Sequence, residues 1–299
     1  MKGATPAAAL HGQVVAAFGR QYLVETGAGR RYACFPRGKK SSVACGDRVM
    51  FAQTAADQGV IEAIDPRSTL FFRSAAHRQK LIAANVTQIA IVVAAEPSFS
   101  SELIDRCLAA AELQAMRAFI VLNKCDLKDA AKAALARLAP YGQAGYRLIQ
   151  LSALQDAGAL LPLLTGQSTV LIGQSGMGKS TIINGLLPDA HIATREISLF
   201  LASGKHTTTN ARLYRLDADS TLVDSPGLQE FGLHHLTRQE IEHGFVEFRP
   251  YFGKCRFQNC RHLTEPDCAL TQAAAAGEIH PQRLEMFRRI SLAEAGRVG

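Results

Sequence analysis

The stretch at residues 173–180, Gly-Gln-Ser-Gly-Met-Gly-Lys-Ser, matches the phosphate-loop pattern in full. An apolar run at 169–172 precedes it and a helical pattern at 179–187 follows it. Glycines let backbone N–H groups turn toward phosphate oxygens, and the helix N-terminus adds the positive end of its dipole. Lys179 is therefore expected to bridge the β- and γ-phosphates, and Ser180 to bind Mg²⁺. The candidate phosphate-binding residues are Gly173, Gln174, Ser175, Gly176, Met177, Gly178, Lys179, Ser180 and Thr181.

The sequence Asn-Lys-Cys-Asp at 123–126 indicates that the base is guanine. It follows an apolar run at 118–122, so it lies at the carboxyl end of a predicted strand, where ligands bind in open α/β sheets. The Asp126 carboxylate can accept hydrogen bonds from N1–H and the exocyclic amine of guanine. Adenine lacks this pair of donors and would leave that carboxylate unpaired, which is costly when the carboxylate is buried. Asn123 is expected to brace the loop, and the stem of Lys124 to cover the base.

A Ser-Ala turn follows the next predicted strand, at 147–151. Ser152 and Ala153 place a backbone N–H where it can reach guanine O6. The tripeptide Ser-Ala-Leu carries little information alone, so this expectation depends on the neighbouring Asn-Lys-Cys-Asp motif.

Two further segments are expected to complete the magnesium and γ-phosphate site. Asp-Ser-Pro-Gly at 224–227 follows a short apolar run and matches the Asp-x-x-Gly loop of GTPases. Asp224 would hold Mg²⁺ through a water molecule, and the Gly227 N–H would sense the γ-phosphate. Between the two loops, a Thr-rich segment at 204–209 is expected to supply a hydroxyl to Mg²⁺, with Thr208 or Thr209 favoured.

The sequence lacks the residue that most often positions the attacking water in GTPases. Many GTPases use a Gln directly after the Asp-x-x-Gly glycine, but Leu228 stands there and cannot hydrogen-bond water. His206 is the candidate for this role, and a contact between His206 and a partner alone is the alternative. We therefore expect slow intrinsic hydrolysis that needs a partner to assemble the site.

A cluster of cysteines and one histidine near the C-terminus has the spacing of a metal site. Three thiolates and an imidazole suit a closed, tetrahedral Zn²⁺ site with a structural role, because four protein ligands leave no position open for catalysis. The expected ligands are Cys255, Cys260, His262 and Cys268.

Composition bounds the class of protein. A chain of 299 residues with 47% apolar content predicts two or three domains. No apolar run reaches the ~20 residues of a membrane span, and we expect a soluble, cytoplasmic protein without a secretory leader. The seven cysteines are an odd number and mostly scattered, which argues against a disulfide framework.

The elements needed to position these motifs fall into three predicted domains. Residues 1–75 read as a five-stranded OB-like barrel, with strands at 11–18, 22–26, 31–35, 47–52 and 60–64. Residues 76–232 alternate buried strands (86–94, 118–122, 147–151, 169–172, 221–223) with helices (101–115, 128–138, 179–187), which predicts a mostly parallel sheet. Residues 233–299 read as a mainly helical zinc-binding module that ends in a helix at 281–293.

The net charge of +7 is uneven along the chain. Residues 1–75 hold ten Lys and Arg against five Asp and Glu, whereas the other two domains are nearly balanced. A basic barrel indicates a polyanionic partner, although a merely solvated surface explains the charge equally well. The basic residues in or beside the barrel loops are Arg30, Arg31, Arg37, Lys39 and Lys40.

The order of the motifs is permuted, because the base motif precedes the phosphate loop. This order is that of the circularly permuted GTPases, and within them the chain resembles the small-ribosomal-subunit-dependent GTPase A family. The strings Gly-Gln-Ser-Gly-x-Gly-Lys-Ser, His-Thr-Thr-Thr and Asp-Ser-Pro-Gly carry the resemblance, which covers nearly the whole chain. Lys205 and Gln229 depart from it, since Arg is expected at both positions.

The resemblance implies a GTPase that assists late maturation of the small (30S) ribosomal subunit and binds its 16S rRNA. It implies GTP or GDP as the bound nucleotide, and no DNA or membrane partner; we expect a monomer. Two alternatives stay open at this point. The first is an RNA-binding module whose nucleotide is structural and whose hydrolysis is incidental. The second is a small-molecule kinase, which Asp126 disfavours.

Overall fold

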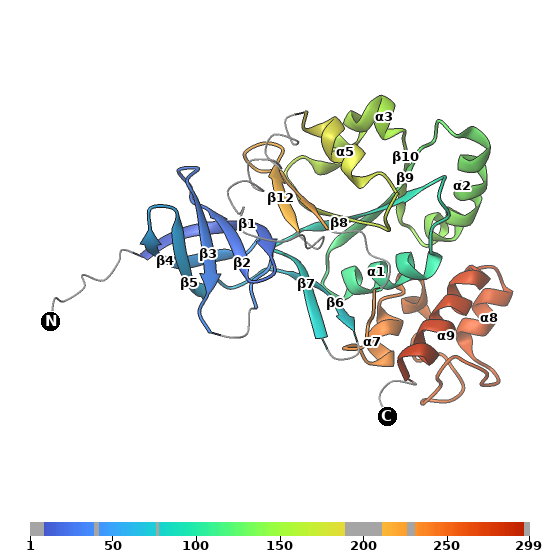
Figure 1. Ribbon diagram of the computed structural model, residues 1–299. Helices are drawn as coiled ribbons and strands as arrows, with labels where there is room; N and C mark the ends of the chain where they lie inside the picture. The colour runs from blue at the N-terminus through green and yellow to red at the C-terminus, as the bar shows by residue number, and fades with distance from the viewer. Residues whose placement is uncertain (1–8, 39–41, 76–77, 189–210, 226–230, 296–299) are drawn as a thin grey trace.

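The computed structural model describes residues 9–38, 42–75, 78–188, 211–225 and 231–295. Figure 1 shows three parts side by side: a β-barrel at the N-terminus, a central α/β region, and a group of helices at the C-terminus. The predicted multi-domain fold class is thereby confirmed.

The N-terminal barrel is formed by five strands: β1 (Ala9–Phe18), β2 (Gln21–Glu25), β3 (Arg31–Pro36), β4 (Arg48–Ala55) and β5 (Gln58–Ile64). They pair in the order β1-β2-β3-β5-β4, and β4 returns to pair with β1, so the sheet closes. Alternate residues of each strand point inward, which gives the barrel its own small core. In that core the rings of Tyr32 and Phe51 lie 5.1 Å apart.

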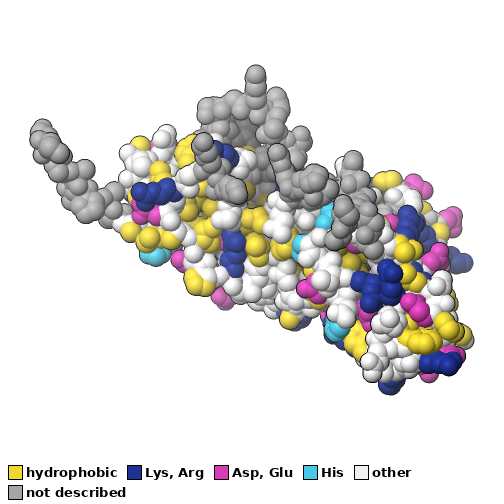
Figure 2. Space-filling view, turned by 90° about the horizontal axis from the view of Figure 1, so that it is seen from below, with side chains coloured by type: hydrophobic (Ala, Val, Ile, Leu, Met, Phe, Trp, Pro, Cys, Tyr) yellow, Lys and Arg dark blue, Asp and Glu magenta, His cyan; other side chains and the backbone are white. Residues whose placement is uncertain are grey.

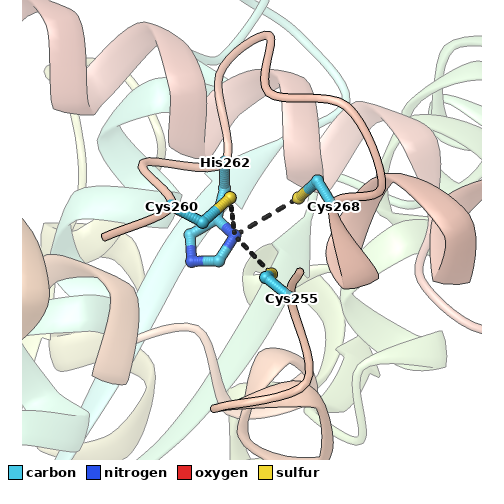
Figure 3. A group of neighbouring side chains, drawn as sticks. All are labelled: Cys255, Cys260, His262 and Cys268. Atoms are coloured by element: carbon cyan, nitrogen blue, oxygen red, sulfur yellow. Dashed lines mark hydrogen bonds between the residues drawn. The ribbon is translucent and has the colours of Figure 1, made fainter. Parts of the chain in front are cut away.

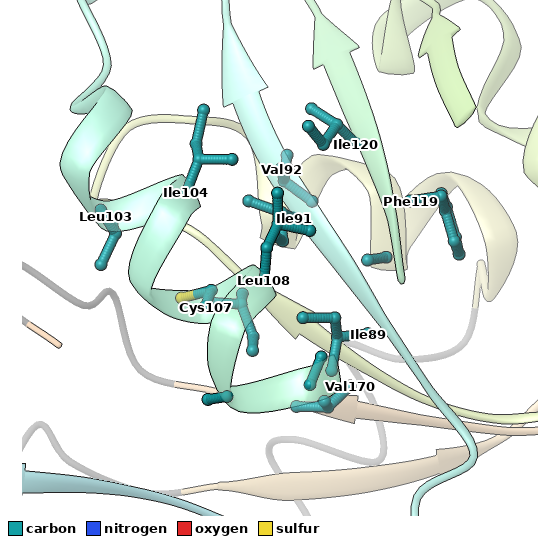
Figure 4. Packing of buried hydrophobic residues seen from close by; sticks show 14 of the residues in the cluster. Ile89, Ile91, Val92, Leu103, Ile104, Cys107, Leu108, Phe119, Ile120 and Val170 are labelled. Carbon is teal, nitrogen blue, oxygen red and sulfur yellow. The ribbon is translucent and has the colours of Figure 1, made fainter. Parts of the chain in front are cut away.

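The central sheet contains five parallel strands in the order β10-β9-β8-β11-β13. They are β8 (Gln88–Ala94), β9 (Arg117–Asn123), β10 (Arg147–Gln150), β11 (Ser168–Ile172) and β13 (Thr221–Asp224). Every residue of β8 is buried, as expected for a strand covered on both faces. Helices α1 (Ser101–Leu113) and α5 (Lys179–Leu186) lie on opposite sides, and α2 (Lys128–Gln143) follows β9. Figure 4 shows Ile104 and Leu108 of α1 packed toward Ile89 and Ile91 of β8.

Secondary structure that was not predicted occurs in three regions of the described chain. Strand β12 (Arg212–Arg215) is antiparallel to β13 and also pairs with β1, so barrel and central sheet form one continuous sheet. Strands β6 (Leu70–Ala75) and β7 (Arg78–Ala84) form a separate hairpin, and the predicted boundary between residues 75 and 76 falls between its two strands. After β10 come three short helical pieces, α3 (Ala153–Asp156), η1 (Ala157–Leu160) and α4 (Leu161–Leu164).

The C-terminal module consists of α7 (Arg238–His243), η2 (Val246–Tyr251), α8 (Ala269–Ala275) and α9 (Pro281–Ala295). It packs on α1 through buried ion pairs. Arg283 of α9 contacts Asp105 of α1, and Arg106 of α1 contacts Glu294 of α9. Because both ends of these pairs are buried, breaking one would leave a charge without a partner, so α9 is firmly fixed to α1. Across the described ranges, no helix is both long and apolar enough to cross a membrane.

Candidate functional site: a phosphate loop and a cysteine-histidine cluster

The phosphate loop connects β11 to α5, and two of its glycines are required by close contacts. Gly178 has φ +93°, and a Cβ there would lie 2.1 Å from Nδ2 of Asn123. A Cβ on Gly173 would lie 2.2 Å from the carbonyl oxygen of Val92. Any other residue at these two positions would displace the base-reading loop or strand β8.

Asn123 occupies the centre of the site and is only 2% exposed. Its Nδ2 donates to the carbonyl oxygen of Met177 over 3.0 Å, and its Oδ1 accepts from the backbone N–H of Ala153 over 2.9 Å. One amide side chain therefore joins three predicted motifs: the base motif, the phosphate loop and the Ser-Ala turn. The bracing role expected from the sequence extends across the whole site.

The residues predicted to read the base lie at the carboxyl ends of β9 and β10. Lys124 has φ +62°, and the side chain of Asp126 is exposed, so its carboxylate is accessible to a base. The N–H of Ala153, predicted to face guanine O6, is donated to Asn123 instead. It can reach a base only if that hydrogen bond is shared. The hydroxyl of Ser152 is buried without a hydrogen-bond partner among the described residues.

Lys179 and Asp224 lie on the inner side of the phosphate loop. Lys179 is 8% exposed, and its Nζ donates to the carbonyl oxygens of Gly173 and Gln174 over 2.7 and 3.1 Å. Burial lowers the pKa of Lys179, and the nearby Asp224 opposes this effect. Burial raises the pKa of Asp224, because it disfavours the charged carboxylate, and the charges of Lys179 and Arg212 oppose this effect.

The donor atoms needed for Mg²⁺ are present. Asp224 Oδ1 is buried and has no hydrogen-bond partner among the described residues, which is a costly arrangement for a carboxylate oxygen. Ser180 is exposed at the start of α5, as is expected of a hydroxyl that reaches a cation beside the phosphates. A hard cation with oxygen ligands fits this pair. Next to Asp224, the Ser225 hydroxyl donates to the Leu171 carbonyl over 2.6 Å and fixes the end of β13.

The rest of the predicted switch machinery lies outside the described residues. Residues 189–210 contain Lys205, His206, Thr208 and Thr209, and residues 226–230 contain Gly227, Leu228 and Gln229. Their proposed roles depend on the sequence alone.

Ser100 is a contact of the phosphate loop that was not predicted. Its backbone N–H donates to Oε1 of Gln174 over 2.8 Å, and its hydroxyl caps α1 by accepting from Leu103 N–H over 3.2 Å. The only sequence signal is a serine directly before a helical pattern. Through this contact the phosphate loop is attached to the N-terminus of α1.

The four predicted metal ligands converge (Figure 3). Their ligand atoms all lie within 4.8 Å of one another. Nδ1 of His262 is 3.5, 3.6 and 3.3 Å from the sulfurs of Cys255, Cys260 and Cys268. A tetrahedral Zn²⁺ with bonds of about 2.0–2.3 Å sets its ligands roughly 3.5–3.8 Å apart, so the cluster fits the ion. The opposite ring nitrogen, Nε2, lies 3.0 Å from Oε1 of Glu242, a contact that the sequence did not predict.

Comparisons with known proteins agree with this geometry. A family model described as RsgA GTPase matches residues 64–234. A protein of Nitrosospira multiformis named "Small ribosomal subunit biogenesis GTPase RsgA" is 54% identical over 281 residues, which cover 94% of this chain and 90% of that protein. A protein of the same name from Burkholderia pseudomallei is 52% identical over 284 residues, which cover 93% and 90%.

Two solved structures are similar over nearly their whole length. The crystal structure of YjeQ from Thermotoga maritima has a TM-score of 0.72 and 28% identity, and the match covers 97% of this chain and 99% of that chain. The structure of YloQ, described as a circularly permuted GTPase, has a TM-score of 0.68 and 24% identity, with 99% of each chain covered. The second comparison concerns the fold alone.

Proposed function

This chain belongs to the RsgA GTPase family, and on that premise we propose that it hydrolyses GTP on the small (30S) ribosomal subunit and assists the late maturation of that subunit. The observation that carries the proposal is the position of Asn123. Its two hydrogen bonds hold a guanine-reading loop, a phosphate loop and the Ser-Ala turn in one site. A phosphate loop alone would fit ATP equally well, whereas Asp126 on the same braced loop selects guanine.

In the proposed reaction, water attacks the γ-phosphate in line with the leaving oxygen. Lys179 exchanges its two carbonyl partners for β- and γ-phosphate oxygens, and the loop amides stabilise the charge of the transferring group. When bound to Ser180, Asp224 and Thr208 or Thr209, Mg²⁺ supplies further charge neutralisation. His206 positions the water, and the Gly227 N–H contacts the γ-phosphate.

We propose that the three predicted domains, 1–75, 76–232 and 233–299, divide the work. The barrel contacts 16S rRNA, with Arg20, Arg30 and Arg48 exposed on it. Other barrel arginines are paired, for example Arg31 with Glu25 over 3.0 Å. Figure 2 shows basic and acidic side chains interspersed on the face it presents, so that face is not uniformly basic. We further propose that the protein is a cytoplasmic monomer.

We propose that Cys255, Cys260, His262 and Cys268 hold one structural Zn²⁺. The loop that carries them has little regular structure between η2 and α8, and a metal supplies the cross-links that such a loop lacks. Metal analysis of the purified chain and titration with a chelator test this part of the proposal. We expect one Zn²⁺ per chain, and a chain that folds identically without metal would contradict it.

The function is tested by measuring GTP hydrolysis alone and with small subunits, large subunits or free rRNA. We expect strong stimulation by small subunits only. Asp126→Ala is the control, because it removes guanine recognition and leaves the phosphate loop intact. Equal rates of GTP hydrolysis under all four conditions would contradict the proposal and favour an RNA-binding module with incidental hydrolysis.

A further inference from the structure

The imidazole of His262 makes contacts through both of its ring nitrogens. Nδ1 faces the three sulfurs, and Nε2 points away from them (Figure 3), where it lies 3.0 Å from Oε1 of Glu242. A neutral imidazole carries its proton on one nitrogen only. A carboxylate at Nε2 therefore favours the tautomer whose Nδ1 lone pair is free for a metal.

Glu242 is placed there by α7. Only 8% of it is exposed, and its second oxygen lies 3.4 Å from Arg238 on the same helix. The helix is fixed at its start by a capping box, in which Thr237 and Glu240 exchange hydrogen bonds. Burying a carboxylate costs free energy unless the group has partners. The contacts with His262 and Arg238 offset that cost for Glu242.

The backbone of His262 is held from another direction. It has φ +60°, an uncommon conformation for a residue with a side chain, which persists where the surroundings hold it. Nε of Arg288 on α9 donates to the His262 carbonyl over 2.6 Å, and Nη2 of Arg288 donates to the Thr271 hydroxyl over 2.8 Å. His262 is thus gripped by α7 through its ring and by α9 through its backbone.

We propose that Glu242 is the positioning residue of the metal centre: it accepts the Nε2–H of His262, sets the ligating tautomer and fastens the metal loop to α7. The inference rests on the proposed Zn²⁺ site and adds a fifth residue that does not itself bind the ion. Carboxylate partners of this kind orient a histidine ligand and raise its basicity. Metal binding also becomes linked to the position of α7, which begins two residues after Leu236.

The test uses the full-length chain and two readouts. Zinc affinity is measured by competition with a chromogenic chelator, and the ligand set by the visible absorption of the Co²⁺-substituted protein. We expect Glu242→Ala to keep the wild-type Co²⁺ spectrum, since no ligand is lost, and to weaken zinc binding by about tenfold to a hundredfold. Glu242→Gln should recover part of the affinity, because its amide oxygen can still accept from Nε2–H.

The matched control is Glu240→Ala, on the same helix, which breaks the capping box and leaves the His262 contact in place. We expect its zinc affinity to stay within about twofold of wild type. An unchanged affinity in Glu242→Ala, or an equal loss in both alanine variants, overturns the inference. Should Glu242→Ala not fold, Glu242→Gln decides, and wild-type affinity in that variant is then the overturning result. A wild-type chain that binds neither metal contradicts the zinc site itself, which is a different outcome.

Discussion

Replacing Asn123 with aspartate separates the two hydrogen bonds of this side chain. Aspartate keeps an oxygen that can accept from Ala153 N–H but loses the donor to Met177, so the Met177 carbonyl then faces a carboxylate oxygen. Leaving a buried polar group unsatisfied costs about 1–3 kcal/mol. If that cost destabilises the loop conformation that binds phosphate, the affinity for GTP and GDP falls roughly 5- to 150-fold.

The measurement is isothermal titration calorimetry with GTP, GDP and ATP, after a thermal melt has established that the variant is folded. Asn123→Ala loses both hydrogen bonds and should bind more weakly than Asn123→Asp. Gln174→Ala is the comparison on the other side of the loop, where the lost contact is the 2.8 Å bond from Ser100 N–H. A folded Asn123→Asp variant that binds GTP within twofold of wild type would refute the bracing role.

Three further predictions concern single residues. Gly178→Ala should abolish measurable GTP binding in a filter assay, because φ is +93° and the new Cβ would lie 2.1 Å from Asn123 Nδ2; retained binding contradicts this. Asp126→Ala should erase the preference for GTP over ATP in competition calorimetry, whereas a persisting preference would mean that another group reads the base. Burial lowers the pKa of His235, against the charges of Glu240 and Glu294, so the unfolded chain binds more protons than the folded protein just below pH 6.5. Stability is therefore lost as pH falls through that window, and melting temperatures of His235→Phe should depend less on pH there; identical pH profiles would argue against it.

The elements predicted best are those whose signal is local. The five barrel strands and the five parallel strands all lie within about three residues of their predicted bounds, because alternation or continuous apolar runs mark them directly. Strand β12 is four residues long and reads Arg-Leu-Tyr-Arg. Its place is set by pairing with β13 and with β1, whose contacting residue Ala16 is nearly two hundred positions away. No local pattern contains that information.

The hairpin β6–β7 shows a different limit. The predicted domain boundary between residues 75 and 76 separates its two strands, because the sequence shows no local signal that joins them. What fixes the hairpin is tertiary packing: the ring of Phe71 stacks on Phe231 at 5.3 Å, and Ser74 N–H donates to the Gly232 carbonyl over 3.1 Å. Both partners come from a segment more than 150 residues later in the chain.

Within the candidate site, motif residues were predictable and their supports were not. The phosphate loop and the base motif are recognisable in the sequence because their chemistry requires particular residues at fixed spacings. Ser100 contacts the phosphate loop and Glu242 contacts the cysteine-histidine cluster, each from another element, and neither spacing nor residue type marks them. The commitment of the Ala153 N–H to Asn123 is likewise a matter of geometry, since the sequence shows only that an N–H is present.

Permutation of the chain changes what the Asp-x-x-Gly loop is connected to. In the unpermuted order, the chain continues from this loop toward the base-reading strand of the same sheet. Here the described chain resumes at Phe231, packs on hairpin β6–β7, and places Nδ1 of His234 2.6 Å from Oε2 of Glu294 on α9. Within ten residues of Asp224 the chain has therefore contacted the hairpin that follows the barrel and the last helix of the metal module. A loop can transmit a change only to elements packed against the chain that follows it. The permuted order therefore gives both flanking parts direct contact with the segment that follows Asp224 in the chain.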